Sequence, residues 1–226
     1  MPRLPLALVV LSLLFAGCTM FGDDDEPDVT IPTNATPPGP PPPPPPPSVG
    51  SVVSKANDTW RYQGDFNETV VSTVTGANAS VVRLRTVSER PGAEAHETIT
   101  VFDAQTLALL QVQDNLIAGG VILRFDPPLA VLIPAEDHIY NGTLIAVTPF
   151  GDIRQPASAN VRFLGLENVT VPAGTFETYR YNATIQSQGA FPFGQETEIW
   201  FAPKVEQAVK TIRDGRLQEL VSYDIS

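Results

Sequence analysis

The sequence predicts an all-β domain, and three observations carry this prediction. From residue 51 onward, short runs of β-branched and aromatic residues recur between turn signals, and no segment keeps a helical 3.6-residue period. The runs follow one another too closely for helical crossovers, which favours an antiparallel meander. Several runs are apolar on both faces, whereas the strands of a flat sheet with one solvated face are apolar on one face only. We therefore expect a strongly curved antiparallel sheet, a half-barrel or a sandwich-like arrangement, with little or no helix.

The expected strands can be taken in chain order. Each is a short run with β-forming side chains, bounded by glycine, proline, asparagine or aspartate. They cover residues 59–65, 69–75, 80–88, 94–102, 107–113, 121–125, 130–133, 143–147, 160–166, 176–185, 195–201, 209–213 and 217–223.

The turns between these strands are expected where a residue tolerates positive φ or a proline fixes a bend. Gly119-Gly120 is interpreted as a bulge or bend before Val121. The expected turns are residues 76–78, 90–92, 126–128, 141–142, 172–174 and 214–215.

The two faces of the expected strand 176–185 can be assigned from its alternation. Asn182 opens an Asn-X-Thr triplet, and a glycan acceptor has to reach solvent. The opposite face, with Tyr179, Tyr181 and Ile185, is then predicted to point inward. Thr178, Arg180 and Asn182 are predicted to be accessible.

The first residues of the chain predict export and a lipid anchor. Residues 4–16 are an apolar run that follows Arg3 and ends in Phe15-Ala16-Gly17-Cys18. A membrane-spanning helix needs about 20 apolar residues, so this run is typical of a signal peptide. It resembles a bacterial or archaeal lipoprotein precursor, with Phe15 where the lipobox usually has leucine. The resemblance implies that Cys18 becomes the lipidated first residue; the alternative is a chance cysteine beside an ordinary signal-peptidase site.

The segment after Cys18 predicts a spacer. Five acidic residues lie within residues 23–28, and prolines follow at 37, 38 and 40–47. Such a proline run adopts polyproline II, so residues 37–47 would span roughly 34 Å. We expect a signal peptide over 1–17, a lipidated cysteine with an acidic, Pro-rich spacer over 18–50, and one β domain over 51–226.

Asparagine placement predicts surface exposure outside the cytoplasm. Of nine asparagines, seven begin an Asn-X-Ser/Thr acceptor triplet, which indicates N-glycosylation. A milder interpretation is that Asn and Thr both favour turns and strand ends, which explains two or three of them. With Cys18 as the only cysteine, no disulfide can form within the chain, unlike in many secreted eukaryotic domains. An archaeal cell surface is therefore favoured. The candidates are Asn34, Asn57, Asn67, Asn78, Asn141, Asn168 and Asn182.

Charge and motif content exclude several classes of function. The net charge of −11 argues against nucleic acid or anionic lipid headgroups as ligands. Glu94 and His96 could share a strand face, and Asp137-His138-Tyr140 is a second polar cluster, but neither has metal-ligand spacing. No serine lies in a Gly-x-Ser-x-Gly elbow. We expect no enzyme activity, no metal and no cofactor.

The C-terminal third has a recognisable pattern. Residues 169–178 read VTVPAGTFET, residues 196–203 read ETEIWFAP, and Val209-Lys210 follows. This resembles a group of uncharacterised prokaryotic lipoproteins with V-P-A-G-x-F and W-Y/F-x-P motifs. The resemblance covers residues 165–223 and implies a curved antiparallel half-barrel, similar to that of bacterial lipoprotein-carrier proteins. This chain departs from the group by having residues 204–207, KVEQ, in a turn that usually contains glycine.

These patterns lead to a first hypothesis about function. We expect a glycosylated lipoprotein on the outer face of the cell membrane, with a non-enzymatic domain that binds an apolar ligand or lipid. The alternative is a structural or protein-interaction module of the envelope. Tyr179, Tyr181 and Trp200 are the candidate cavity-lining residues, although a large aromatic such as Trp200 is more often a packing residue.

Overall fold

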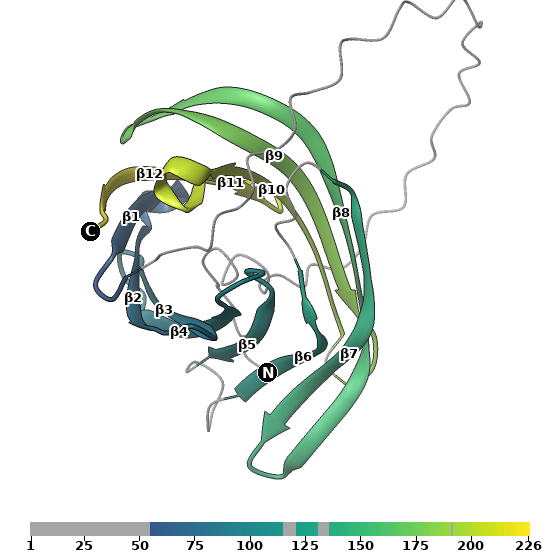
Figure 1. Ribbon diagram of the computed structural model, residues 1–226. Helices are drawn as coiled ribbons and strands as arrows, with labels where there is room; N and C mark the ends of the chain where they lie inside the picture. The colour runs from purple at the N-terminus through teal and green to yellow at the C-terminus, as the bar shows by residue number, and fades with distance from the viewer. Residues whose placement is uncertain (1–54, 115–120, 131–135, 191) are drawn as a thin grey trace, which may run out of the picture.

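The domain is one antiparallel sheet that closes on itself. The computed structural model describes residues 55–114, 121–130, 136–190 and 192–226. Within them, twelve strands form a closed barrel in which each strand pairs with its sequence neighbours and β1 also pairs with β12 (Figure 1). The prediction of a curved antiparallel all-β fold is confirmed, and the sheet closes fully instead of remaining a half-barrel.

The elements follow one another in an up-and-down order, with two short 3-10 turns and no α-helix in the described part. No helix there is long and apolar enough to cross a membrane. The elements are β1 (Thr59–Gly64), η1 (Asp65–Asn67), β2 (Thr69–Ala77), β3 (Val81–Glu89), β4 (His96–Asp103), β5 (Leu109–Asp114), β6 (Val121–Leu129), β7 (His138–Thr148), β8 (Gly151–Val171), β9 (Gly174–Ser187), β10 (Phe193–Ala202), η2 (Pro203–Val205), β11 (Gln207–Arg213) and β12 (Arg216–Asp224).

Neighbouring strands run in opposite directions, so the connections between them alternate between the two ends of the barrel. β1 begins at the end that we call the N-terminal end, where the backbone N–H of Ser226 donates to Asp58 Oδ1 (2.9 Å). The start of β1 and the last residue of the chain therefore meet at this end. The connections β1–β2, β3–β4, β7–β8, β9–β10 and β11–β12 lie at the other end, which we call the far end.

Two apolar clusters hold the barrel together. The first lies on the inner face of the barrel and includes Leu144, Tyr181 and Ile199. The second joins Trp60 and Leu220 to Trp200, which lies on the face of β10 opposite Ile199. Both faces of β10 are covered here because the long β8–β9 hairpin reaches over β12 (Figure 1). In the turn of the β8–β9 hairpin, the N–H of Ala173 donates to the carbonyl of Leu220 on β12 (3.0 Å).

Two expected turns are wrong, because they lie inside strands. Residues 126–128 are part of β6, and Asn141-Gly142 lies in the middle of β7. Gly142 does not form a turn. It leaves room for the hydroxyl of Tyr140, which a Cβ at this position would overlap. That hydroxyl donates to the carbonyl of Pro127 on the next strand (2.9 Å). The glycine thus permits a close packing contact inside the sheet.

The remaining turn signals agree with the structure except at residues 76–78, where Gly76 and Ala77 belong to β2 and only Asn78 lies beyond it. Residues 172–173 separate β8 from β9, and Gly174 has φ 136°. Asp214 and Gly215 separate β11 from β12, both with positive φ. In the turn that departs from the resembled group, Glu206 takes the left-handed conformation with φ 54° and ψ 25°. This is the conformation that glycine adopts most easily. Gly119-Gly120, and residues 131–133 of the expected strand 130–133, lie outside the described residues.

The face assignment of β9 is confirmed for the tyrosines and wrong for Thr178. Tyr179 and Tyr181 are 6% and 2% exposed, and Arg180 and Asn182 are partly exposed. Thr178 was expected to be accessible but is 0% exposed. It lies where the hairpin is covered on both faces, and its hydroxyl donates to the carbonyl of Glu167 (2.9 Å). Burial of the outer face at this point depends on contacts that strand alternation does not encode.

Candidate functional site

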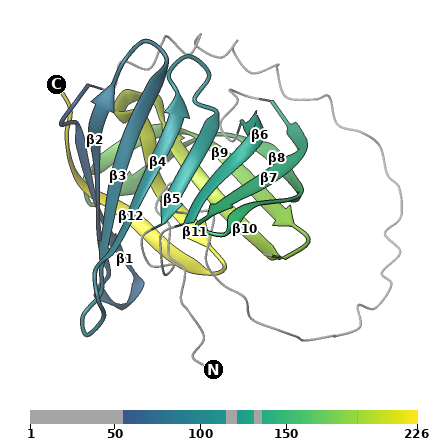
Figure 2. The ribbon, with the colours of Figure 1, turned by 90° about the horizontal axis from the view of Figure 1, so that it is seen from below.

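One side of the barrel interior is polar. Alternation places seven side chains on the inner faces of β2 to β5, and each is 6% exposed or less. Cross-strand pairing brings them together: Ser88 lies opposite His96, and Thr98 lies opposite Asp114. Figure 2 shows these four strands side by side. We call this set the polar wall: Ser72, Thr86, Ser88, His96, Thr98, Thr100 and Asp114.

The centre of the polar wall is a buried imidazole–carboxylate pair. Nε2 of His96 lies 3.0 Å from Oδ1 of Asp114, and the two side chains are 6% and 2% exposed. Nearby, Ser72 and Thr86 share a hydrogen bond between their hydroxyls (3.0 Å). Burial of such groups is costly unless each finds a partner, so this arrangement is unusual for a purely structural wall.

Several buried polar atoms of the interior have no hydrogen-bond partner among the described residues. Two belong to the polar wall, Nδ1 of His96 and Oγ1 of Thr100, and two lie on β1 and β11, the hydroxyls of Tyr62 and Thr211. Desolvation raises the pKa of the Tyr62 phenol far above its ordinary value, so it stays a neutral hydroxyl. Atoms like these call for a water or a ligand.

Charged groups lie at the far end of the interior. The hydroxyl of Ser88 donates to Oε1 of Glu68 (2.5 Å), and a nitrogen of Arg90 lies 3.7 Å from Oε2 of the same carboxylate. Burial lowers the pKa of Arg213 to about 10, and the negative charges of Asp214 and Glu68 oppose that shift. Arg213 therefore remains a cation at neutral pH, attracted first by Asp214 and then by Glu68.

The side of the ring opposite the polar wall carries the aromatic cluster of the interior, with the buried polar pairs Gln155–Ser187 and Gln195–Thr197 beside it. In a ring of twelve, β9 lies six strands away from β3. Its inner face presents Tyr179, Tyr181 and Ile185, and the ring of Phe163 from β8 packs 5.6 Å from that of Tyr181. Small buried side chains lie among them: Ala146, Ala157, Ala159 and Ala183.

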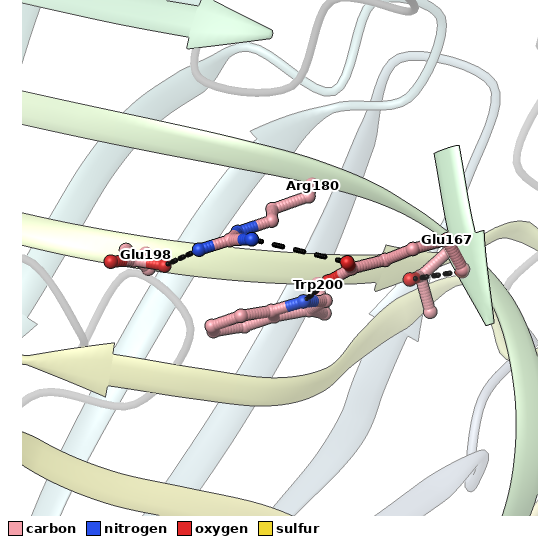
Figure 3. A network of polar contacts seen from close by, with 5 residues as sticks. Glu167, Arg180, Glu198 and Trp200 are labelled. Carbon is pink, nitrogen blue, oxygen red and sulfur yellow. Dashed lines mark hydrogen bonds and ion pairs between the residues drawn. The ribbon is translucent and has the colours of Figure 1, made fainter. Parts of the chain in front are cut away.

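A second polar network lies on the other face of β10 (Figure 3). The indole N–H of Trp200 donates to Oε1 of Glu167. Arg180 lies 2.7 Å from Glu198 Oε2 and 3.9 Å from Glu167 Oε2, and its guanidinium is 5.0 Å from the Trp200 ring centroid. Lys210 lies 5.2 Å from the same centroid. The network links β8, β9, β10 and β11 and is suited to holding the long hairpin in place.

The structure does not bring the three candidate cavity residues together. Tyr179 and Tyr181 belong to the interior cluster, whereas Trp200 belongs to the cluster on the opposite face of β10. Only the two tyrosines are placed to line the barrel interior.

The glycosylation candidates in the described part all reach the surface. Five are exposed and Asn182 is partly exposed, its Nδ2 donating to Oε1 of Glu196 (2.7 Å). Cys18, Asn34, the apolar run and the Pro-rich spacer lie outside the described residues. The five exposed candidates are Asn57, Asn67, Asn78, Asn141 and Asn168.

Sequence reasoning found His96 but paired it with the wrong residue. Glu94 is exposed, and the actual partner Asp114 is 18 residues away on β5. The strand register is the signal that could have found it.

In the second sequence cluster, Asp137 accepts from the backbone N–H of Phe163 (2.9 Å), and burial helps to raise the pKa of Tyr140 to about 12. Among the residues that the structure describes, no group of three or more His, Cys, Asp or Glu is placed to hold a metal ion.

Comparisons with known proteins give similarity in structure only. No protein-family model matches the chain, and no curated protein matches it. The hypothetical lipoprotein YmcC from Escherichia coli has a TM-score of 0.41 and 9% identity, over 77% of this chain and 86% of that one. A Bacteroides fragilis protein, provisionally described as exported and with a YmcC-like fold, has a TM-score of 0.44 and 11% identity, over 76% and 97%.

A third solved structure is similar at the same level. It comes from Parabacteroides distasonis, is provisionally described as a lipoprotein, and has a TM-score of 0.41 and 11% identity, over 76% and 96% of the two chains. These descriptions belong to those proteins.

Proposed function

We propose that this chain is a lipid-anchored, N-glycosylated surface protein that holds an apolar ligand inside its barrel without transforming it. One observation carries the proposal: a closed ring of twelve strands encloses an apolar cluster around Tyr181 and a polar wall with unpartnered buried polar atoms. Barrel width grows with strand number, and eight strands already suffice to hold one small ligand. Small interior side chains on β7, β8 and β9 favour further room for a ligand.

The anchor and the sugars are supported by the sequence and by exposure. The apolar run before Cys18 supports lipidation, and the described acceptor asparagines all have access to solvent. β1 starts at the N-terminal end of the barrel, so the spacer would reach the domain there and the far end would be turned away from the anchor. An envelope interaction module remains the alternative, and the absence of any ligand would favour it.

The direct test is native mass spectrometry of the glycoprotein purified from its own membrane. We expect a mass that exceeds the lipidated, glycosylated chain by one apolar molecule, which organic extraction removes. A protein that is free of ligand after gentle purification, and that binds no apolar probe afterwards, would contradict the proposal.

A matched pair of variants tests whether the ligand lies inside the barrel. Ala159→Leu adds volume to the interior, where Ala159 is 3% exposed, whereas Asn160→Leu adds it to the outer face of the same strand. We expect the first to weaken uptake of an apolar fluorescent probe at least about tenfold, and the second to leave it unchanged. Overpacking costs about 1–3 kcal/mol, so circular dichroism should verify that the variant stays folded. Equal uptake by both variants would place the ligand elsewhere.

A further inference from the structure

The His96–Asp114 pair determines what kind of ligand atom can meet the polar wall. A carboxylate accepts hydrogen bonds, so Nε2 of His96 carries the proton that points to Asp114 Oδ1 at 3.0 Å. In the neutral imidazole, Nδ1 then has no proton and acts as an acceptor. This nitrogen is buried and has no partner among the described residues. In the neutral form of His96, it is therefore a buried acceptor that lacks a donor.

Carboxylates and guanidinium groups occur in equal number around this acceptor. Asp114 is hydrogen-bonded to His96, Arg90 lies 3.7 Å from Glu68, and Arg213 feels the charges of Asp214, Glu68 and Arg216. With a neutral imidazole, these charges cancel. A ligand carboxylate or phosphate would bring a further negative charge close to Asp114 and Glu68. An ammonium group would meet Arg90 and Arg213. A net charge without a partner in a buried site is costly, so a neutral ligand group fits best.

We infer that the ligand is a neutral amphipathic alcohol, whose hydroxyl donates a hydrogen bond to Nδ1 of His96 while its apolar body packs against the Tyr179 and Tyr181 side of the barrel. This inference rests on the proposed function. A hydroxyl supplies the required donor without charge. Its oxygen can also accept from a neighbouring hydroxyl or water, which satisfies both partners.

The test compares ligands that differ only at the head group. The full chain with Cys18→Ser is titrated at neutral pH with hexadecanol, hexadecyl fluoride, hexadecane and hexadecanoate, each displacing the same apolar fluorescent probe. The fluoride has the size of the alcohol but no donor. We expect the alcohol to bind about tenfold to hundredfold more tightly than the fluoride, because an unpartnered buried acceptor costs about 1–3 kcal/mol.

A double variant shows whether the preference comes from His96. His96→Leu combined with Asp114→Leu removes both members of the buried pair, which is often tolerated when apolar residues of similar volume replace them. The alcohol-to-fluoride ratio should fall to about one, while hexadecane binds as before. His138→Leu, at a half-buried histidine on β7, should keep the full ratio.

The outcomes separate this inference from the proposed function. If alcohol and fluoride bind equally well to the unaltered interior, or if hexadecanoate binds best, the head-group assignment is overturned and the binding function stands. If the double variant stays folded and keeps the alcohol preference, His96 is not the acceptor. If none of the probes binds, both the proposed function and this inference are contradicted.

Discussion

Arg180 lies over the face of Trp200, with its guanidinium carbon 5.0 Å from the ring centroid. The two residues are cross-strand partners on β9 and β10, and Glu167 from β8 contacts both. Trp200 belongs to the W-F-x-P motif, and Arg180 lies on the strand that follows the V-P-A-G motif. The two motifs are therefore connected through this contact. These contacts give Trp200 a structural role in holding β8, β9 and β10 together.

Shortening Trp200 should destabilise the barrel in two steps. Trp200→Phe keeps most of the packing but removes the N–H that Glu167 accepts, which we expect to cost about 1–2 kcal/mol. Trp200→Ala should cost about 3–5 kcal/mol. Urea denaturation followed by circular dichroism measures both. Phe150→Ser, at a fully exposed side chain, is the control and should stay within about 0.5 kcal/mol. Equal stability of all three variants would contradict the packing role.

Asn182 should carry a glycan in the protein isolated from its source. It lies in the middle of β9 on the partly exposed outer face, so its occupancy tests the face assignment more sharply than the asparagines near turns do. Asn182→Gln should lower the intact mass by one glycan. Asn160→Gln, an exposed asparagine without an acceptor triplet, should not. Unmodified Asn182 beside occupied Asn141 and Asn168 would show that this prediction is wrong.

Tyr62 should make the protein lose stability at alkaline pH. Desolvation raises its pKa in the folded state, whereas an unfolded tyrosine loses its proton near pH 10. Above that pH the folded state holds one proton more than the unfolded state, so the free energy of unfolding falls as pH rises. The free energy of unfolding of the wild type should therefore fall relative to that of Tyr62→Phe by about 1.4 kcal/mol per pH unit above about pH 10.

Denaturation curves at several alkaline pH values measure this difference. Thr211→Val removes another buried hydroxyl that does not titrate in this range, so its difference from the wild type should stay constant. A constant difference for Tyr62→Phe as well would show that the phenol reaches solvent in the folded state.

Cys18 should be the only membrane attachment. Cys18→Ala is expected to release the protein into the medium or to leave an unprocessed precursor, because no thiol remains to carry lipid. Cell fractionation with an immunoblot distinguishes these products. Phe15→Leu, which brings the run closer to the usual lipobox, should leave attachment intact. A Cys18→Ala protein that stays in the membrane at the mature size would rule out the lipid anchor.

The sequence by itself determined the features that depend on neighbouring residues. Alternation and turn residues predicted an antiparallel all-β domain, the turns at Gly174 and Gly215, and the burial of Tyr179 and Tyr181. The predicted export signal, spacer and acceptor triplets are also local patterns. A few adjacent residues are enough to specify such features, because backbone preference and side-chain period act over short distances.

Only the tertiary structure decided how the strands meet. Closure through β1 and β12, the burial of Thr178, the place of Gly142 inside a strand and the pairing of His96 with Asp114 all join residues far apart in the chain. Each depends on strand register, and a shift of one residue would turn every side chain to the other face. The free energy that selects a register comes from packing summed over many strands, and no local pattern contains it.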